Sequence, residues 1–172
     1  VGANGYYGHR VYAAFTHLVD TPYVLYLDQD CALESHHVQS CVQTIEEKKL
    51  DWTYSLRSIY GKDGEFICND DCESLGKWPV FSGDYNHIDT NCYCIKTSVA
   101  IKLSQVWHGG WGQDRVWLQV LSQHFKNFDC TGEYTVNYKL AGNDGSVKPE
   151  FFNYGNNIMK QKYNGDFPWT KK

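Results

Sequence analysis

The sequence predicts an α/β fold in which helices flank a central, mostly parallel sheet. Residues 23–27 form a continuous run of large apolar and aromatic side chains, which is typical of a strand buried on both faces. Helical periodicity marks residues 9–19, 36–48 and 113–125. Helices that alternate with buried strands indicate a sheet covered by helices, and 172 residues are enough for one domain with a core.

The first predicted helix covers residues 9–19. Its apolar side chains recur at intervals of three and four residues and are Val11, Ala14, Phe15, Leu18 and Val19. Pro22 then starts an extended segment, because proline fixes its own φ and disfavours helix in the residue before it. The strand that follows is expected to run through residues 23–27, and a pair of acids comes directly after it.

Asp28 and Asp30 lie one residue apart, just past the predicted carboxyl end of this strand. In open α/β sheets ligands bind at that edge. Two neighbouring carboxylates repel each other unless a positive charge lies between them, and hard cations such as Mg²⁺ and Mn²⁺ prefer carboxylate oxygen. The pair therefore indicates a metal site. The alternative from local sequence alone is that Asp28 caps a turn and Asp30 is a solvated loop residue.

The rest of the chain alternates between helix and strand patterns. Ser35 is a good N-cap for the helix over residues 36–48. A strand over residues 52–60, a turn and a return strand predict a hairpin. The later predicted elements are a loop at 69–85, a strand at 88–95, a short helix at 97–106, an aromatic glycine-rich loop at 107–112, a helix at 113–125 and a strand at 134–140.

Composition excludes some function classes. The formal net charge is −4 and no basic run exceeds the last two lysines, so nucleic acid and membrane surfaces have no electrostatic support as partners. No apolar run approaches 18 residues, so no transmembrane segment is predicted. The seven cysteines are odd in number and scattered, which favours free thiols and a soluble protein of a reducing, cytoplasmic compartment. A disulfide, or a zinc site built from Cys68, Cys72, Cys92 and Cys94, is the alternative.

Four segments together resemble glycosyltransferases of the GT-A fold, in particular family 2. Residues 4–10 (N-G-Y-Y-G-H-R) resemble the approach to the family's metal motif, and residues 23–30 resemble the strand with its D-x-D motif. Residues 87–92 (H-I-D-T-N-C) resemble the strand near the acceptor site, and residues 111–114 (W-G-Q-D) resemble the start of the helix that carries the catalytic base. The order and spacing agree over about residues 4–125. A weaker similarity is to chlorella-virus glycosyltransferase domains.

This resemblance implies a GT-A-like (Rossmann-like) fold and a catalytic domain over residues 1–140. Residues 1–60 would bind the nucleotide-sugar and residues 61–140 the acceptor. The family's first βαβ portion, which holds the base, is expected to lie before Val1 and to be missing from this numbering. Residues 141–172 have weak periodicity and are expected to form a C-terminal lid or linker.

The implied reaction moves a sugar from a nucleotide-diphosphate sugar, with a UDP-sugar favoured, to a hydroxyl of a glycan or glycoprotein. Mn²⁺ or Mg²⁺ held by Asp28 and Asp30 would stabilise the charge of the departing diphosphate. Asp114 would remove the proton of the attacking hydroxyl, which implies inversion at the anomeric carbon in a single displacement. The alternative for Asp114 is an ordinary first-turn helix residue that the helix dipole favours.

The remaining implied contacts concern the two substrates. Arg10, Gln29 and Asp28 are the candidates for donor binding, and Asp89, Trp111 and Trp78 are those for acceptor binding. Trp111 and Trp78 are equally well explained as core residues. Two other function classes remain open, namely a nucleotidyltransferase that acts on a sugar phosphate and a non-catalytic sugar-binding module.

Overall fold

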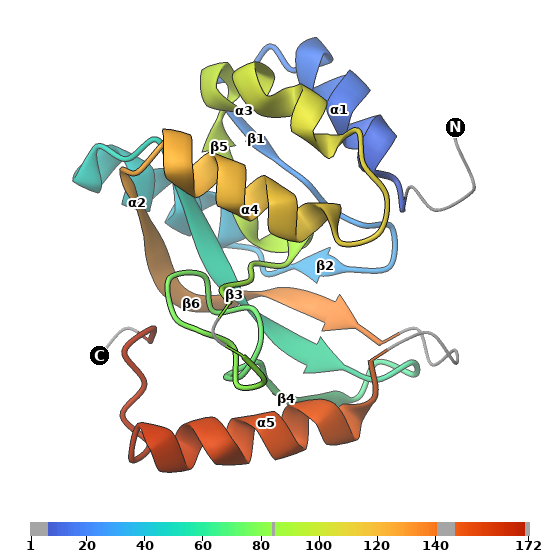
Figure 1. Cartoon of the computed structure of the whole chain (residues 1–172), viewed down its shortest axis with the longest axis vertical. Coiled ribbons are helices and arrows are strands. Elements are labelled where there is room, and N and C mark those ends of the chain that lie inside the picture. The colour runs from blue at the N-terminus through green and yellow to red at the C-terminus, as the bar shows by residue number, and fades with distance from the viewer. Residues whose placement is uncertain (1–6, 84, 141–146, 171–172) are drawn as a thin grey trace.

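The computed structural model describes residues 7–83, 85–140 and 147–170, which form a mixed α/β fold (Figure 1). One sheet joins the described strands, which are β1 (Tyr23–Leu25), β2 (Ala32–Leu33), β3 (Trp52–Tyr60), β4 (Phe66–Asn69), β5 (Tyr93–Lys96) and β6 (Phe128–Lys139). The α-helices are α1 (His9–Phe15), α2 (His37–Lys48), α3 (Thr97–Leu103), α4 (Gln113–His124) and α5 (Pro149–Lys162). Short 3₁₀ turns are η1 (Thr16–Leu18), η2 (Thr90–Cys92) and η3 (Ser104–Trp107).

The sheet is mixed, which corrects the expectation of mostly parallel strands. Its order is β1-β5-β3-β6-β2, with β4 paired to β3. Only the β3–β6 pair is parallel among the described strands, and the other pairs are antiparallel. Because β5 lies antiparallel between β1 and β3, the strands β1, β3 and β6 all point in one direction. Their carboxyl ends, and the amino end of β5, therefore meet at one edge of the sheet.

The strand predicted over residues 23–27 is shorter than expected. β1 ends at Leu25 and lies at the end of the described strand order, paired only with β5. The apolar run continues without sheet pairing, with Tyr26 buried against the core and Leu27 46% exposed. The continuous apolar pattern therefore arose from a short strand followed by a core aromatic residue, not from a long strand buried on both faces.

Most predicted helices and the hairpin are confirmed, but two helical details are not. The α1 segment contacts the core through Tyr12 and Ala13, whereas Phe15 and Leu18 of the predicted apolar stripe are exposed. The helix α2 starts one residue later than predicted, with His36 instead of Ser35 at its N-cap. Tertiary contacts therefore decide which face of α1 is buried and where α2 begins, and both differ from what the local pattern predicts.

The strand predicted over residues 88–95 begins later, because Asp89 caps a turn in front of it. The Asp89 side chain accepts a hydrogen bond from the Asn91 amide N–H, which stabilises η2. Only Tyr93–Lys96 then join the sheet as β5. This turn places polar side chains at the sheet edge where β1, β3 and β6 end.

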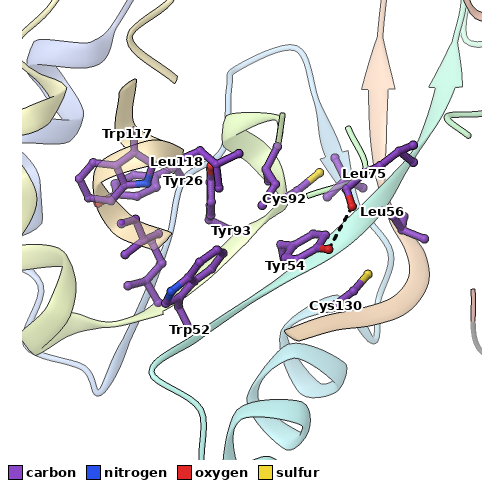
Figure 2. Packing of buried hydrophobic residues seen from close by; sticks show 14 of the residues in the cluster. Tyr26, Trp52, Tyr54, Leu56, Leu75, Cys92, Tyr93, Trp117, Leu118 and Cys130 are labelled. Atoms are coloured by element: carbon purple, nitrogen blue, oxygen red, sulfur yellow. Dashed lines mark hydrogen bonds between the residues drawn. The ribbon is translucent and has the colours of Figure 1, made fainter. Parts of the chain in front are cut away.

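Aromatic side chains dominate the core. Trp52, Tyr54 and Tyr93 of neighbouring strands are fully buried, and Trp117 packs from α4 (Figure 2). The rings of Trp107 and Trp117 are stacked with centroids 4.4 Å apart. The aromatic richness of the sequence is therefore used largely for packing.

The C-terminal residues 149–170 belong to the same core, which corrects their description as a loose lid or linker. Phe152 and Met159 of α5 are buried, and so is Trp169 beyond the helix. Figure 1 shows α5 running beneath β4, at the opposite end of the molecule from α1 and α3. Residues 141–146 of the predicted lid or linker lie outside the part of the chain that the structure describes. No helix among the described residues is long and apolar enough to cross a membrane.

Candidate active site

A cavity of about 340 Å³ opens at the sheet edge where β1, β3 and β6 end. Elements far apart in sequence contribute its walls, including the segment after β1, the turn before β5 and the start of α4. Its lining residues are Tyr7, His9, Tyr12, Asp28, Arg57, Glu73, His87, Asp89, Thr90, Trp111, Gly112, Asp114, Arg115, Tyr138 and Val147. The edge is the one at which open α/β sheets bind ligands.

Asp28 reaches this cavity and is held on both carboxylate oxygens. The Tyr12 hydroxyl donates to Oδ1, and the Asn91 Nδ2 donates to Oδ2 at 3.0 Å. The Asn91 Oδ1 in turn accepts the Asp28 backbone N–H at 2.6 Å. Burial raises the pKa of Asp28, and the hydrogen bonds from Tyr12 and Asn91 oppose that shift only in part. The Asp28 carboxylate is thus oriented by two neutral hydrogen-bond donors in a partly desolvated environment.

Asn91 also binds the second carboxylate of the cavity, Asp89. Its Nδ2 donates to the Asp89 Oδ1 at 2.8 Å, and Asn91 is fully buried. One amide therefore fixes Asp28 and Asp89 relative to each other across the sheet edge. In the sequence, Asn91 lies in the H-I-D-T-N-C segment, in which only Asp89 is predicted as a site residue.

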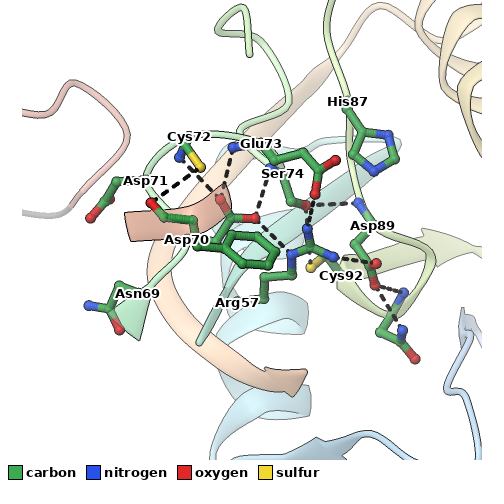
Figure 3. Close-up of polar contacts among 12 residues, drawn as sticks. Arg57, Asn69, Asp70, Asp71, Cys72, Glu73, Ser74, His87, Asp89 and Cys92 are labelled. Carbon is green, nitrogen blue, oxygen red and sulfur yellow. Dashed lines mark hydrogen bonds and ion pairs between the residues drawn. The ribbon is translucent and has the colours of Figure 1, made fainter. Parts of the chain in front are cut away.

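Arg57 also lines the cavity, and its guanidinium is surrounded by carboxylates (Figure 3). Its Nε donates to Asp70 at 2.8 Å, its Nη1 to Asp89 at 2.6 Å and its Nη2 to Glu73 at 2.5 Å. Burial alone would lower the pKa of Arg57, but the three carboxylates raise it well above its usual value. Burial would likewise raise the pKa of Asp70, and the Arg57 charge and hydrogen bonds lower it instead. In the sequence, the signal for this cluster is an arginine in the middle of a predicted strand.

Asp114 faces the same cavity from the first turn of α4. Gly112 precedes the helix at φ 77°, a left-handed conformation that glycine adopts without strain. The Asp114 Oδ1 accepts the Arg115 backbone N–H, and its Oδ2 lies 3.8 Å from His87 Nε2. The Asp114 side chain is 28% exposed, so it is accessible to a ligand in the cavity.

The other predicted site residues divide into two groups. Trp111 lies at the cavity rim and is 75% exposed, which excludes the alternative that it is a core residue. Asp30 and Gln29 are exposed on the turn after Asp28 and do not line the cavity. Arg10 also lies outside the lining, whereas its neighbour His9 belongs to it.

Trp78 lies apart from this site. Its ring packs 5.8 Å from that of Trp169, and it lines a different hollow beside β6. The structure thus brings Asp28, Asp89, Asp114 and Trp111 together and leaves Trp78 elsewhere. It adds His9, Tyr12, Arg57, Glu73, His87 and Asn91, which the sequence reasoning had not proposed.

The described residues contain no group of three or more His, Cys, Asp or Glu side chains arranged to hold a metal ion. The donor set at the end of β1 consists of carboxylate oxygens, of which Asp30 is exposed. Such a set fits a hard cation that takes one or two protein carboxylates and completes its shell with water and substrate phosphates. It does not fit a zinc site, and all seven cysteines are free in the structure.

Comparison with solved structures confirms the GT-A-like α/β fold. TarS 1–349 of S. aureus in complex with UDP aligns with a TM-score of 0.57 and 12% identity over 96% of this chain. A second structure of S. aureus TarS 1–349 gives a TM-score of 0.54 and 10% identity over 77% of this chain, and TarS 1–349 in complex with UDP-GlcNAc gives 0.52 and 12% over 88%. The chain spans 48%, 40% and 45% of those three chains.

Sequence comparison adds one short similarity. An uncharacterized protein of Haemophilus influenzae is 34% identical over 64 residues, which are 37% of this chain and 43% of that protein. No family model matches the chain. These comparisons give no support to the similarity to chlorella-virus glycosyltransferase domains.

Proposed function

We propose that this chain is the catalytic part of a metal-dependent glycosyltransferase that uses a nucleotide-diphosphate sugar. The observation that carries the proposal is the convergence of Asp28 and Asp114 on one cavity from separate elements. The fold adds support, because the TarS structures of the same fold were solved with UDP and UDP-GlcNAc. A UDP-sugar is therefore the favoured donor.

The donor diphosphate would lie over the turn that carries Asp28 and Asp30. Asp30 would bind Mn²⁺ or Mg²⁺ directly, and Asp28 would bind it directly or through water, or contact the ribose. When bound, the cation stabilises negative charge on the departing diphosphate. Arg10 and Gln29 flank this place and are proposed donor contacts.

Asp114 would act as the general base toward the acceptor. A hydroxyl must lose its proton as it attacks the anomeric carbon, and a carboxylate across the cavity from the leaving diphosphate can accept that proton. This arrangement implies inversion in a single displacement. Asp89 and Trp111, which share the cavity, would contact the hydroxyls and one face of the acceptor sugar.

The test measures UDP released from a panel of UDP-sugars with Mn²⁺. We expect Asp114→Asn to lower kcat by about 10²- to 10⁴-fold, since general base catalysis contributes that much. Asp30→Ala should abolish dependence on Mn²⁺ together with most turnover. Asp63→Asn, which changes a carboxylate in an exposed turn outside the cavity, is the matched control and should leave turnover unchanged.

The same assay separates the other function classes. Release of pyrophosphate from a nucleoside triphosphate would indicate a nucleotidyltransferase. Sugar binding by calorimetry without nucleotide or metal would indicate a binding module. Turnover that survives Asp30→Ala without added metal would contradict the proposed metal dependence.

A further inference from the structure

We propose that the cavity receives the transferred sugar and selects an uncharged sugar over one that carries a carboxylate. This inference rests on the proposed function and extends it to the class of donor. It is carried by the balance of charges around the cavity and by buried nitrogen atoms that have no hydrogen-bond partner.

The cavity wall carries more carboxylates than permanently charged cationic side chains. Asp28, Glu73, Asp89 and Asp114 line it, and two permanently charged cationic side chains, Arg57 and Arg115, belong to the lining among the described residues. The Arg57 guanidinium uses Nε, Nη1 and Nη2 for three carboxylates at 2.5 to 2.8 Å, those of Asp70, Glu73 and Asp89. One positive charge against three negative charges leaves this buried cluster with an excess of two negative charges.

Arg115 offsets little of that excess inside the cavity. It is exposed at the rim, and its guanidinium lies over two aromatic rings, 4.9 Å from the Tyr85 centroid and 5.5 Å from the Trp111 centroid. Charges near the surface are screened by water and salt far more than charges below it. A carboxylate on a bound sugar would therefore meet uncompensated carboxylates within the cavity.

Two histidines supply the complementary feature. His9 and His87 both line the cavity and are each only 7% exposed. The Nδ1 atom of each ring is buried without a hydrogen-bond partner among the described residues. Such atoms are costly unless a ligand pairs with them. A sugar hydroxyl both donates and accepts, so a small shift of either ring would let it pair with that nitrogen in either tautomer.

The experiment compares donors that differ only at C6, namely UDP-glucose with UDP-glucuronic acid and UDP-galactose with UDP-galacturonic acid. Calorimetric Kd with Mn²⁺ and kcat/KM for UDP release are measured for each. Two carboxylates about 6 Å apart in a protein environment weaken binding by about 100-fold. We expect the neutral member of at least one pair to be favoured by about that factor.

A charge-removing variant tests the cause. Glu73→Gln keeps the side chain's shape and removes one charge from the cavity, so the preference for the neutral donor should fall by about tenfold. Glu47→Gln, the same change on an exposed position of α2, should leave the ratio unchanged. Measuring a ratio within each variant cancels any general loss of active protein.

The outcomes separate this inference from the function on which it rests. Equal Kd and equal UDP release within both donor pairs would overturn the sugar selection and leave a glycosyltransferase. A preference that persists unchanged in Glu73→Gln would also overturn the charge argument. No binding and no UDP release with any of the four donors would overturn the inference, and the same result with the whole panel of UDP-sugars would overturn the proposed function as well.

Discussion

Asp28 combines a fixed orientation with an environment that disfavours its charge. Tyr12 and Asn91 hold its two oxygens, while burial raises the pKa of its carboxyl group. A carboxyl group whose pKa is raised in the folded state binds protons more tightly there than in the unfolded chain. Its ionisation therefore lowers the free energy of unfolding as the pH rises through and above the ordinary carboxyl range.

We predict that Asp28→Asn stabilises the fold while it removes activity. The gain in unfolding free energy should be larger at about pH 7.5 than at about pH 4.5, because the raised pKa makes the charge of wild-type Asp28 increasingly unfavourable to the folded state as the pH rises. Urea denaturation of both proteins at the two pH values measures this difference. Asp63→Asn, at an exposed turn, is the control, and a gain for Asp28→Asn that shrinks as the pH rises would contradict the prediction.

The residues that orient Asp28 show what a local pattern misses. The D-x-D pair is visible because two carboxylates follow an apolar run, whereas Asn91 lies 63 positions later. Tyr12 had been given no role in the predicted helix, yet it donates to Asp28. Partners so distant in sequence are chosen by the packing of α1, β1 and η2, not by any spacing.

At the scale of elements, α5 is joined to the rest of the fold by a close contact at Gly155. A Cβ placed there would lie 2.7 Å from the Cys72 Sγ and 2.7 Å from a Phe81 ring carbon. Both neighbours belong to the loop between β4 and η2. Helix and loop thus approach each other at a distance that only glycine allows.

We predict that Gly155→Ala destabilises the protein by up to about 2 kcal/mol. Alanine usually favours a helix interior over glycine by about 1 kcal/mol, but overpacking a tight contact costs about 1–3 kcal/mol. Asn157→Ala, at an exposed position of the same helix, is the control and should stabilise by at most about 0.7 kcal/mol. Thermal or urea unfolding of both variants checks this, and a stabilising Gly155→Ala would show that α5 is not held as described.

Strand direction could not be predicted from the apolar patterns. Residues 52–60 were correctly predicted as a strand, and this strand pairs parallel with β6 but antiparallel with β5 and β4. A strand buried on both faces has the same composition in either arrangement. The connections, in which a long loop and η2 lead into β5, decide the direction.

For the molecule as a single unit, Arg57 is a residue that joins the sheet to the rest of the fold. It extends from β3 to three acids of the loop between β4 and η2, and its guanidinium lies 4.4 Å from the Tyr138 ring centroid of β6 and 5.6 Å from that of Phe152 in α5. The buried charge network is therefore also a junction of the sheet, this loop and the C-terminal helix.

We predict that Arg57→Met lowers the free energy of unfolding by about 3–5 kcal/mol, because it leaves buried carboxylates unpaired. Lys77→Met is the matched control, since Lys77 pairs with Asp129 at the surface, where such pairs contribute at most about 1 kcal/mol. Adding Asp70→Asn and Glu73→Gln to Arg57→Met should restore part of the loss. Equal effects of the two methionine variants in urea denaturation would contradict a stabilising role for the network.

Periodicity and local motifs predict the α/β class, most helices, the hairpin and three acids of the candidate site, because they are properties of neighbouring residues. The mixed strand directions, the docking of residues 149–170 and the partners of those acids follow instead from contacts between segments that are distant in the chain. Asn91 contacts Asp28, Arg57 contacts Asp89 and His87 contacts Asp114. No local sequence pattern encodes contacts over such chain separations. Burial and charge compensation are energies of the assembled molecule, so they appear only once the chain has folded.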